Sequence, residues 1–132
     1  MPAWSQDARW TGAASSDWDS NGNWSPAVVP TGTAVFGASA RTSVGFSQID
    51  TSVGTIQFDP TAPAYTYTLS CVSLPGCVLQ PQTLTLTGAG IINNAATIPS
   101  FVIATRTKLT VQAGTAANAN FLMSGGGGQL SF

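Results

Sequence analysis

Short apolar runs separated by turn-forming residues recur along the chain from Thr42 onward. In two of them, Tyr65–Leu69 and Leu84–Leu86, apolar residues alternate strictly with threonine. Alternation with a period of two places apolar side chains on one face of a strand and threonine on the other. The pattern therefore predicts many short β-strands. The runs are Val53–Phe58, Tyr65–Ser70, Thr83–Thr87, Ile91–Ile92, Phe101–Ile103, Leu109–Val111, Phe121–Met123 and Leu130–Phe132.

The spacing of these runs narrows the fold class. They lie mostly about ten residues apart, which is typical of an all-β sandwich or barrel and also of a parallel β-helix. The tight-hairpin signal Asn-Gly occurs once, at residues 21–22. Runs followed by Gly-Ala-Gly or Ala-Gly recur at 84–90 and 109–114, and QLSF at 129–132 echoes TIQF at 55–58. These features favour the parallel β-helix, with the glycines at its corners.

Residues 1–36 differ from the rest of the chain because they contain all four tryptophans. The intervening segments, SSDWDSNGN and SPAVVPTGT, are rich in turn-forming residues. We expect a compact N-terminal cap over residues 1–36 and stacked strands over residues 37–132. One interpretation is that the tryptophans fill the cap and cover the open end of the solenoid core. The other is a sugar-stacking platform of Trp10, Trp18, Trp24, Tyr65 and Tyr67.

The composition excludes several functions. Charged residues make up 7% of the chain, with four Lys and Arg, five acidic residues that are all Asp, and no His. Four scattered cations and a formal net charge of −1 cannot form a phosphate-binding face, so we exclude nucleic acid as a partner. Without His there is no imidazole base and no His metal site, and we expect no cofactor. The apolar runs are too short for direct membrane insertion.

Two cysteines lie close together in the stretch CVSLPGC. Cys71 and Cys77 flank the turn dipeptide Pro75-Gly76, which suits a disulfide across a short loop. The alternative is two reduced thiols. The low content of charged residues and the abundance of Ser, Thr and Asn are typical of extracellular proteins, in which disulfides form, so we predict the disulfide. A zinc site is not expected, because two thiolates alone leave zinc under-coordinated.

One segment matches the opening of a calcium-binding loop. The pattern Asp17-x-Asp19-x-Asn21-Gly22 places oxygen-bearing side chains at the first three ligand positions and a glycine at the turn. The position of the bidentate Glu in such loops falls here on Val28. The alternative is a turn in which the Asp and Asn side chains accept hydrogen bonds from local amides.

Catalysis would have to rest on few groups. Polysaccharide-cleaving β-helices gather several carboxylates with basic partners on one face. Here the strand-rich part offers Asp50 and Asp59, with Arg41, Arg106 and Lys108 as its cations. Isolated charges of this kind serve solubility or protect sheet edges. We therefore predict that the chain is not an enzyme.

Three longer segments follow one another in a defined order. They are WTGAASSDWDSNGNWSPAVVPTGTAVF at 10–36, VGTIQFDPTAPAYTYTLS at 53–70 and LTLTGAGIINNAATIPSF at 84–101. In this order they resemble the N-terminal part of passenger domains of bacterial autotransporters and related secreted β-solenoid proteins. The resemblance implies an all-β, right-handed parallel β-helix with an N-terminal Trp-rich cap. It also implies export and display on the Gram-negative outer membrane. The family normally adds a C-terminal outer-membrane β-barrel, which nothing in this sequence resembles.

These observations lead to one functional prediction and two alternatives. We expect a non-catalytic, secreted or cell-surface structural or adhesin segment that contacts a host or neighbouring-cell surface, glycans included. The first alternative is a self-assembling extracellular filament subunit, stacking head to tail through an edge at Gln129, Leu130, Ser131 and Phe132. The second alternative is a carbohydrate-binding module. The start lacks the features of a signal peptide and the end falls within a strand pattern, so we expect a piece of a longer chain.

Overall fold

The computed structural model describes residues 6–71, 81–112, 114–116, 118–123 and 128–132. These residues form β-strands and one short 3-10 helix, η1 (Asn21–Asn23). Within the same residues, no helix has the length and apolar character needed to cross a membrane.

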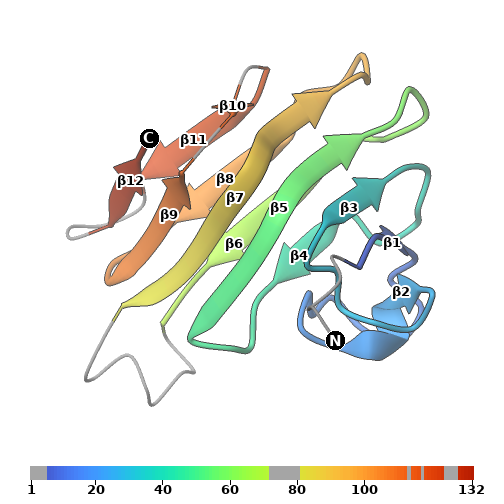
Figure 1. The fold of residues 1–132 in the computed structure, drawn as a ribbon, viewed down its shortest axis with the longest axis horizontal. Coiled ribbons are helices and arrows are strands. Elements are labelled where there is room, and N and C mark those ends of the chain that lie inside the picture. The colour runs from blue at the N-terminus through green and yellow to red at the C-terminus, as the bar shows by residue number, and fades with distance from the viewer. Residues whose placement is uncertain (1–5, 72–80, 113, 117, 124–127) are drawn as a thin grey trace.

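The strands divide between two sheets (Figure 1). The larger sheet follows the order β12-β9-β7-β5-β3-β1-β2, and β10 also pairs with β7. The smaller sheet follows the order β11-β8-β6-β4. The larger sheet consists of β1 (Ala8–Trp10), β2 (Trp24–Ser25), β3 (Thr33–Phe36), β5 (Asp50–Phe58), β7 (Gln82–Asn93), β9 (Thr107–Val111), β10 (Thr115–Ala116) and β12 (Gln129–Ser131). The smaller sheet consists of β4 (Ser43–Gly45), β6 (Thr66–Leu69), β8 (Ser100–Ile103) and β11 (Asn120–Met123).

The chain passes back and forth between the two sheets. From β3 to β9, consecutive strands alternate between the larger and the smaller sheet, so hydrogen-bonded neighbours are distant in sequence. All pairings in the smaller sheet are parallel. In the larger sheet β1 and β2 pair antiparallel, and the other pairings are parallel. The larger sheet is therefore mixed.

The predicted right-handed parallel β-helix is wrong. The described residues form one mixed sheet and a separate four-stranded parallel sheet, without a closed solenoid. Recurring apolar runs predict that strands exist, but contacts between residues distant in sequence decide which strands pair. The larger sheet is mixed because β1 and β2 pair antiparallel. In addition, β5 and β7 extend over 9 and 12 residues, unlike the short runs expected.

The glycines of TGAG lie inside a strand and not at a corner. The expected runs Thr83–Thr87 and Ile91–Ile92 belong to the single strand β7. Its register against β5 shifts between Val53 and Thr55, and such a bulge absorbs the extra residues. Gly90 has a φ of 84°, and a side chain there would overlap the backbone of Thr115 in β10. Glycine therefore permits the close approach of β10 at this point.

The inner faces of the two sheets share one apolar core. Phe36 of β3 lies 5.2 Å, between ring centroids, from Tyr67 of β6, so the core joins the larger sheet to the smaller. Within the smaller sheet, Tyr67 stacks on Phe101 of β8 at 4.7 Å. Aromatic pairs at such distances add stabilisation beyond the area that they bury. The core thus runs along the stacking direction of the strands.

A buried glutamine ties the two sheets together through hydrogen bonds. Gln82, at the start of β7, is fully buried. Its amide nitrogen donates to the carbonyls of Phe46 and Gln48, at 3.0 and 3.1 Å. Its Oε1 accepts from the backbone N–H of Ser70, at 2.9 Å. Because these partners flank strands of the smaller sheet, Gln82 fixes the position of β7 against that sheet.

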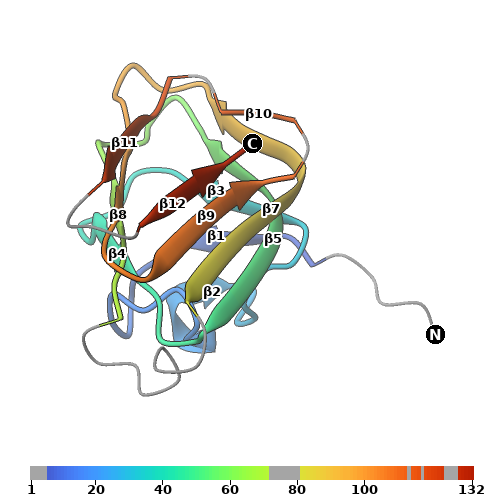
Figure 2. The same cartoon turned by 90° about the vertical axis from the view of Figure 1, so that its left-hand side faces the viewer.

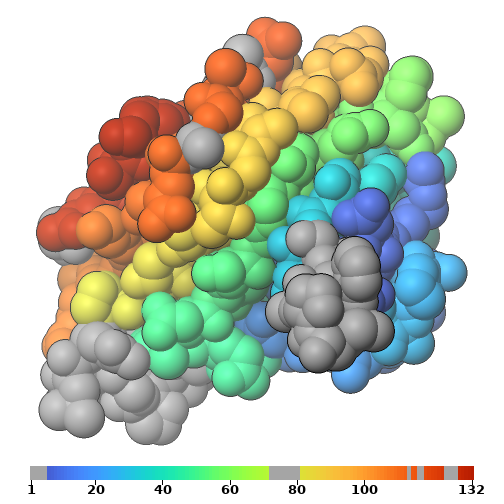
Figure 3. Space-filling model, viewed as in Figure 1, coloured from blue at the N-terminus to red at the C-terminus, as the bar shows by residue number. Residues whose placement is uncertain are grey.

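The first and the last strands lie at opposite ends of the molecule. In the space-filling view, β5, β7 and β9 cover the face between these ends side by side (Figure 3). Turning the molecule brings β11 and β12 toward the viewer, at the edges of the smaller and the larger sheet (Figure 2). We call the part formed by β1, residues 11–20, η1, β2 and the edge strand β4 the closed end. We call the part formed by β11, β12 and Phe132 the open end.

Candidate functional site

Tryptophans fill the closed end. Trp10, Trp18 and Trp24 are each at most 3% exposed, and the rings of Trp18 and Trp24 lie 5.0 Å apart. Trp24 Nε1 donates to the carbonyl of Trp18 at 2.8 Å, and Trp10 Nε1 donates to the carbonyl of Arg41 at 3.0 Å. Trp4 lies outside the described residues. These three tryptophans therefore belong to the apolar core, and the expectation that they cap a solenoid stays a prediction about the cap alone.

The aromatic residues considered for sugar stacking present no free ring face. Tyr65 and Tyr67 are each 1% exposed, and they pack against Phe36 and Phe58 together with the buried tryptophans. Stacking of a sugar requires an accessible ring face, which these aromatic residues lack in this conformation. Burial also raises the pKa of Tyr67 well above its ordinary value. These rings contribute to the core.

Backbone bonds cover the outer edge of the smaller sheet at the closed end. Gly45 of β4 donates its N–H to the carbonyl of Ser16 at 2.7 Å, and its carbonyl accepts from Trp18 at 2.8 Å. Asp17 thereby forms an isolated parallel bridge with Gly45. An edge whose backbone groups are already bonded offers no template for a further strand.

A buried asparagine organises the loop of the closed end. Asn23 Oδ1 accepts from the N–H groups of Ala14 and Ser15, at 2.9 and 2.7 Å. Its Nδ2 donates to Ser15 Oγ and to the carbonyl of Asp17, at 2.9 and 2.8 Å. Its backbone carbonyl accepts from Thr11 at 2.8 Å. This residue was missed in the sequence, where it is one asparagine among several in a turn-rich segment.

The two acidic residues of the predicted calcium loop cap backbone and hydroxyl groups. Asp17 Oδ2 accepts from Ser47 Oγ at 2.7 Å. Asp19 Oδ2 accepts from the N–H groups of Ser47 and Gln48, each at 3.1 Å. Asp19 Oδ1 accepts from Thr51 Oγ1 at 3.1 Å. Desolvation by burial is the main reason why the pKa of Asp19 is raised.

The third residue of that pattern points to another partner. Asn21 Oδ1 accepts from the N–H of Val29 at 3.0 Å. In the described part of the chain, no group of three His, Cys, Asp or Glu side chains is placed to hold a metal ion. The local bond expected in the alternative is the one from the Asp19 N–H to Asp17 Oδ1, at 2.9 Å. The other partners of Asp19 and Asn21 lie farther along the chain.

A shallow hollow of about 320 Å³ lies beside these carboxylates. It is lined by Ser16, Asp17, Gly45, Phe46 and Ser47. The Asp17 carboxylate in this hollow already accepts the Ser47 hydroxyl, and the backbone of Ser16 and Gly45 forms the cover of β4. The polar groups here thus serve the closure of the sheet.

The two carboxylates considered for catalysis lie at opposite ends of one strand. Asp50 begins β5 and Asp59 follows its last residue. At an extended rise per residue, nine residues separate them by roughly 30 Å. The structure therefore does not bring the two carboxylates together, and they cannot act as a pair on one substrate bond.

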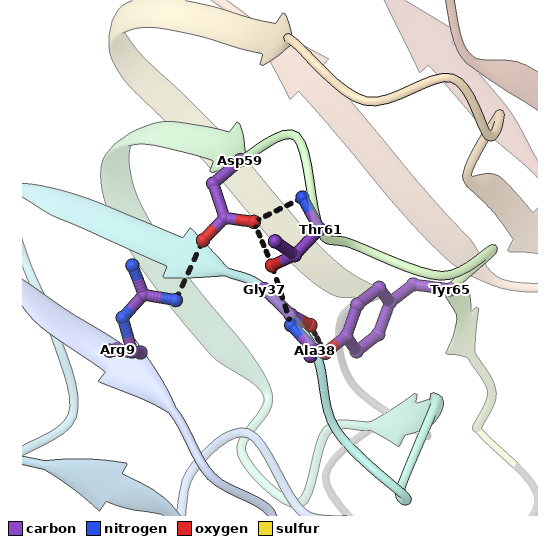
Figure 4. A network of polar contacts seen from close by, with 6 residues as sticks. All are labelled: Arg9, Gly37, Ala38, Asp59, Thr61 and Tyr65. Carbon is purple, nitrogen blue, oxygen red and sulfur yellow. Dashed lines mark hydrogen bonds and ion pairs between the residues drawn. The ribbon is translucent and has the colours of Figure 1, made fainter.

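Asp59 belongs to a polar network on the surface (Figure 4). Its Oδ2 lies 2.8 Å from Arg9 Nη1, and its Oδ1 accepts from the hydroxyl of Thr61 at 2.6 Å. The Thr61 and Arg9 contacts hold the pKa of Asp59 below its ordinary value. A side chain at Gly37 would overlap both Arg9 Nη1 and Asp59 Oδ2, so glycine leaves room for the pair. The network links β1 to the end of β5.

The open end exposes large apolar side chains on two edge strands. Leu122 and Met123 of β11 are 52% and 49% exposed, and Phe132 after β12 is 73% exposed. The aromatic core continues outward, because Phe121 lies 5.6 Å from Phe101 and 6.0 Å from Phe132. β11 and β12 are the last strands of their sheets, so each has one side that pairs with no strand described here. This apolar double edge is the candidate functional surface.

The sequence predicted one half of this surface. The edge expected at residues 129–132 corresponds to β12 and Phe132. The contribution of β11 was missed, although the run Phe121–Met123 was expected to form a strand. Three consecutive apolar residues cannot all face one core in a strand, because successive side chains point to opposite faces. Alternation places Leu122 on the face opposite Phe121 and Met123. The run in β8 breaks alternation in the same way without being exposed, so the exposure of Met123 follows from the position of β11 at the edge of its sheet.

The predicted disulfide falls partly outside the described residues. Cys71 follows β6, and its Sγ lies 3.0 Å from the carbonyl of Arg106. The described residues contain no free cysteine. Cys77 lies outside them, so its pairing with Cys71 stays a prediction.

Comparison with known proteins adds no family assignment. No protein-family model, no curated protein and no solved structure matches the chain. The resemblance of residues 10–36, 53–70 and 84–101 to autotransporter passengers therefore stays a prediction.

Proposed function

We propose that this protein is a non-catalytic structural segment of a secreted or surface-displayed protein, closed at one end and able to associate at the other. The observation that carries the proposal is the contrast between the covered edge at Gly45 and the exposed apolar edges β11 and β12. A surface of this kind acts by strand pairing and apolar contact, without bond-making chemistry.

The roles of the carboxylates support the structural part of the proposal. Asp7 Oδ1 accepts from the N–H of Thr33 at 2.8 Å, which ties the segment before β1 to β3. Asp19 caps the chain before β5, and Asp59 joins β5 to Arg9 of β1. Each of these carboxylates is engaged in holding segments of the fold together.

The composition supports an extracellular setting. A chain with 7% charged residues depends little on ion pairs, and its parallel ladders and shared core supply stability instead. The cysteine pair in CVSLPGC points in the same direction. Cell-surface contact by such a segment would use its outer faces and its open end.

Two measurements on the whole chain test this function. Native-state hydrogen exchange should show β5 and β7 opening only with global unfolding, because a structural segment with one core unfolds as a unit. Incubation with a panel of bacterial and plant polysaccharides should give no new reducing ends or unsaturated sugars. Product formation that Asp50→Asn or Asp59→Asn abolishes would overturn the proposal, as would independent opening of β5.

A further inference from the structure

We propose that the open end binds the open end of a second copy of this chain, so that β12 pairs antiparallel with its own copy and a closed two-fold dimer forms. This inference rests on the proposed function and names its partner. It replaces the head-to-tail stacking expected from the sequence by an arrangement in which two identical ends meet.

The closed end argues against head-to-tail stacking. A second copy arriving there would meet β4, whose Gly45 is already bonded to Ser16 and Trp18. In the larger sheet it would meet β2, which consists of two residues and is followed directly by Pro26. Proline has no N–H to donate to a ladder. The closed end therefore offers almost no strand edge to the open end of another molecule.

The open end has the properties that self-pairing requires. Lysine, other charged residues and proline usually protect sheet edges from pairing. The sequences of β11 and β12, NFLM and QLS, contain none of these residues. No charged residue occurs from Leu109 to Phe132. Two identical copies of this surface can therefore approach each other without repulsion between like charges.

Two-fold symmetry fits both edges at once. A two-fold axis normal to the larger sheet and beside β12 makes that strand antiparallel to its copy. The same rotation brings the smaller sheets to the same side of the dimer, so β11 approaches β11 of the partner. The exposed side chains of Leu122, Met123 and Phe132 are then covered by their counterparts. An isologous interface closes on itself and stops at two copies.

The test is the molar mass of the whole chain by size-exclusion chromatography with light scattering, over a series from about 1 µM to about 1 mM, a range chosen because short edges give weak interfaces. We expect the mass to double from 13.5 kDa and then remain constant. A constant monomer mass over the whole range would overturn the inference. Growth beyond two copies would overturn it as well, in favour of head-to-tail stacking.

Matched variants locate the interface. Leu122→Lys with Met123→Lys places charges on the β11 edge at exposed positions, and we expect this variant to remain monomeric. Ile98→Lys is the control, because Ile98 is 49% exposed, like Met123, but lies outside the edge strands. It should dimerise like the wild type. Loss of the dimer in both variants would contradict the assignment to the open end. A stable, cooperatively unfolding monomer would refute the dimer and leave the structural function intact.

Discussion

The two ends of the molecule differ in whether their large aromatic and apolar side chains are buried. At the closed end Trp18 is fully buried, and backbone bonds from Ser16 and Trp18 occupy the edge of β4. At the open end Phe132 is 73% exposed and β11 and β12 end their sheets. The backbone ladders thus end in a covered edge at the closed end and in an accessible edge at the open end. By the general behaviour of sheet edges, a strand from outside can add where the edge is not already bonded.

The largest expected effect comes from emptying the closed end. Trp18→Ala removes a fully buried ring that contacts Trp24, Phe36 and Phe46, so we expect a loss of about 3–5 kcal/mol in the free energy of unfolding. Denaturant unfolding followed by circular dichroism measures it. Met123→Ala at the open end should change this free energy by less than about 1 kcal/mol, because its side chain is half exposed. Equal losses in the two variants would abolish the contrast between the ends.

The next effect concerns the polar hub of the closed end. Asn23→Ala leaves two N–H groups, of Ala14 and Ser15, without their acceptor, and we expect a loss of about 2–3 kcal/mol. The matched control is Asn21→Ala, which removes a single solvent-exposed bond, from the N–H of the partly buried Val29, and should lose about 1 kcal/mol or less. Thermal unfolding of both variants decides the matter. A control as damaging as Asn23→Ala would mean that the buried network has no special weight.

Some structural features of the two ends could be predicted from the sequence, and others could not. The alternation in Tyr65–Leu69 predicted a strand, and β6 occupies Thr66–Leu69 with Tyr67 and Leu69 buried. The tryptophan-rich segment predicted rings packed together, and Trp10, Trp18 and Trp24 are buried, although the solenoid that they were expected to cap is absent from the described residues. Local patterns of this kind report burial directly, because they depend on residues close in sequence.

Such local patterns did not predict how the strands pair within the sheets. Nothing near Gly88–Gly90 distinguishes a corner from a bulge within β7, because the bulge depends on the register against Gly54 in β5. Likewise, the role of Asn23 depends on Ala14 and Ser15 folding back over it. Long-range pairing fixes these features, and one sequence does not display it.

A smaller effect is expected from the ion pair that joins β1 to β5. The pKa of Asp59 is lowered by Thr61 and Arg9, so its contribution to stability is complete above the ordinary value of 3.8 and disappears as the pH falls through the lower folded value. Because Arg9 is half exposed, solvent screening limits the contribution to about 1 kcal/mol or less. Asp59→Asn should remove this acid dependence from the melting temperature, measured as the pH is lowered from neutral to below 3.8.

A second variant separates the two causes of that shift. Arg9→Ala should remove the part due to the ion pair and retain the part due to the Thr61 hydroxyl. Asp19 acts in the opposite direction, because its raised pKa favours the folded state as the pH falls. An acid dependence that is identical in the wild type and in Asp59→Asn would show that the Arg9–Asp59 ion pair does not stabilise the fold.

The central claim, that association is confined to the open end, is tested most directly by hydrogen–deuterium exchange of the unmodified chain at dilute and concentrated conditions. We predict that peptides covering β11 and β12 become protected at high concentration, because the sides of these strands that pair with no described strand gain hydrogen bonds from a second copy. Peptides covering β1, η1 and β2 should exchange equally at both concentrations. Protection that appears at the closed end as well, or at neither end, would contradict the account.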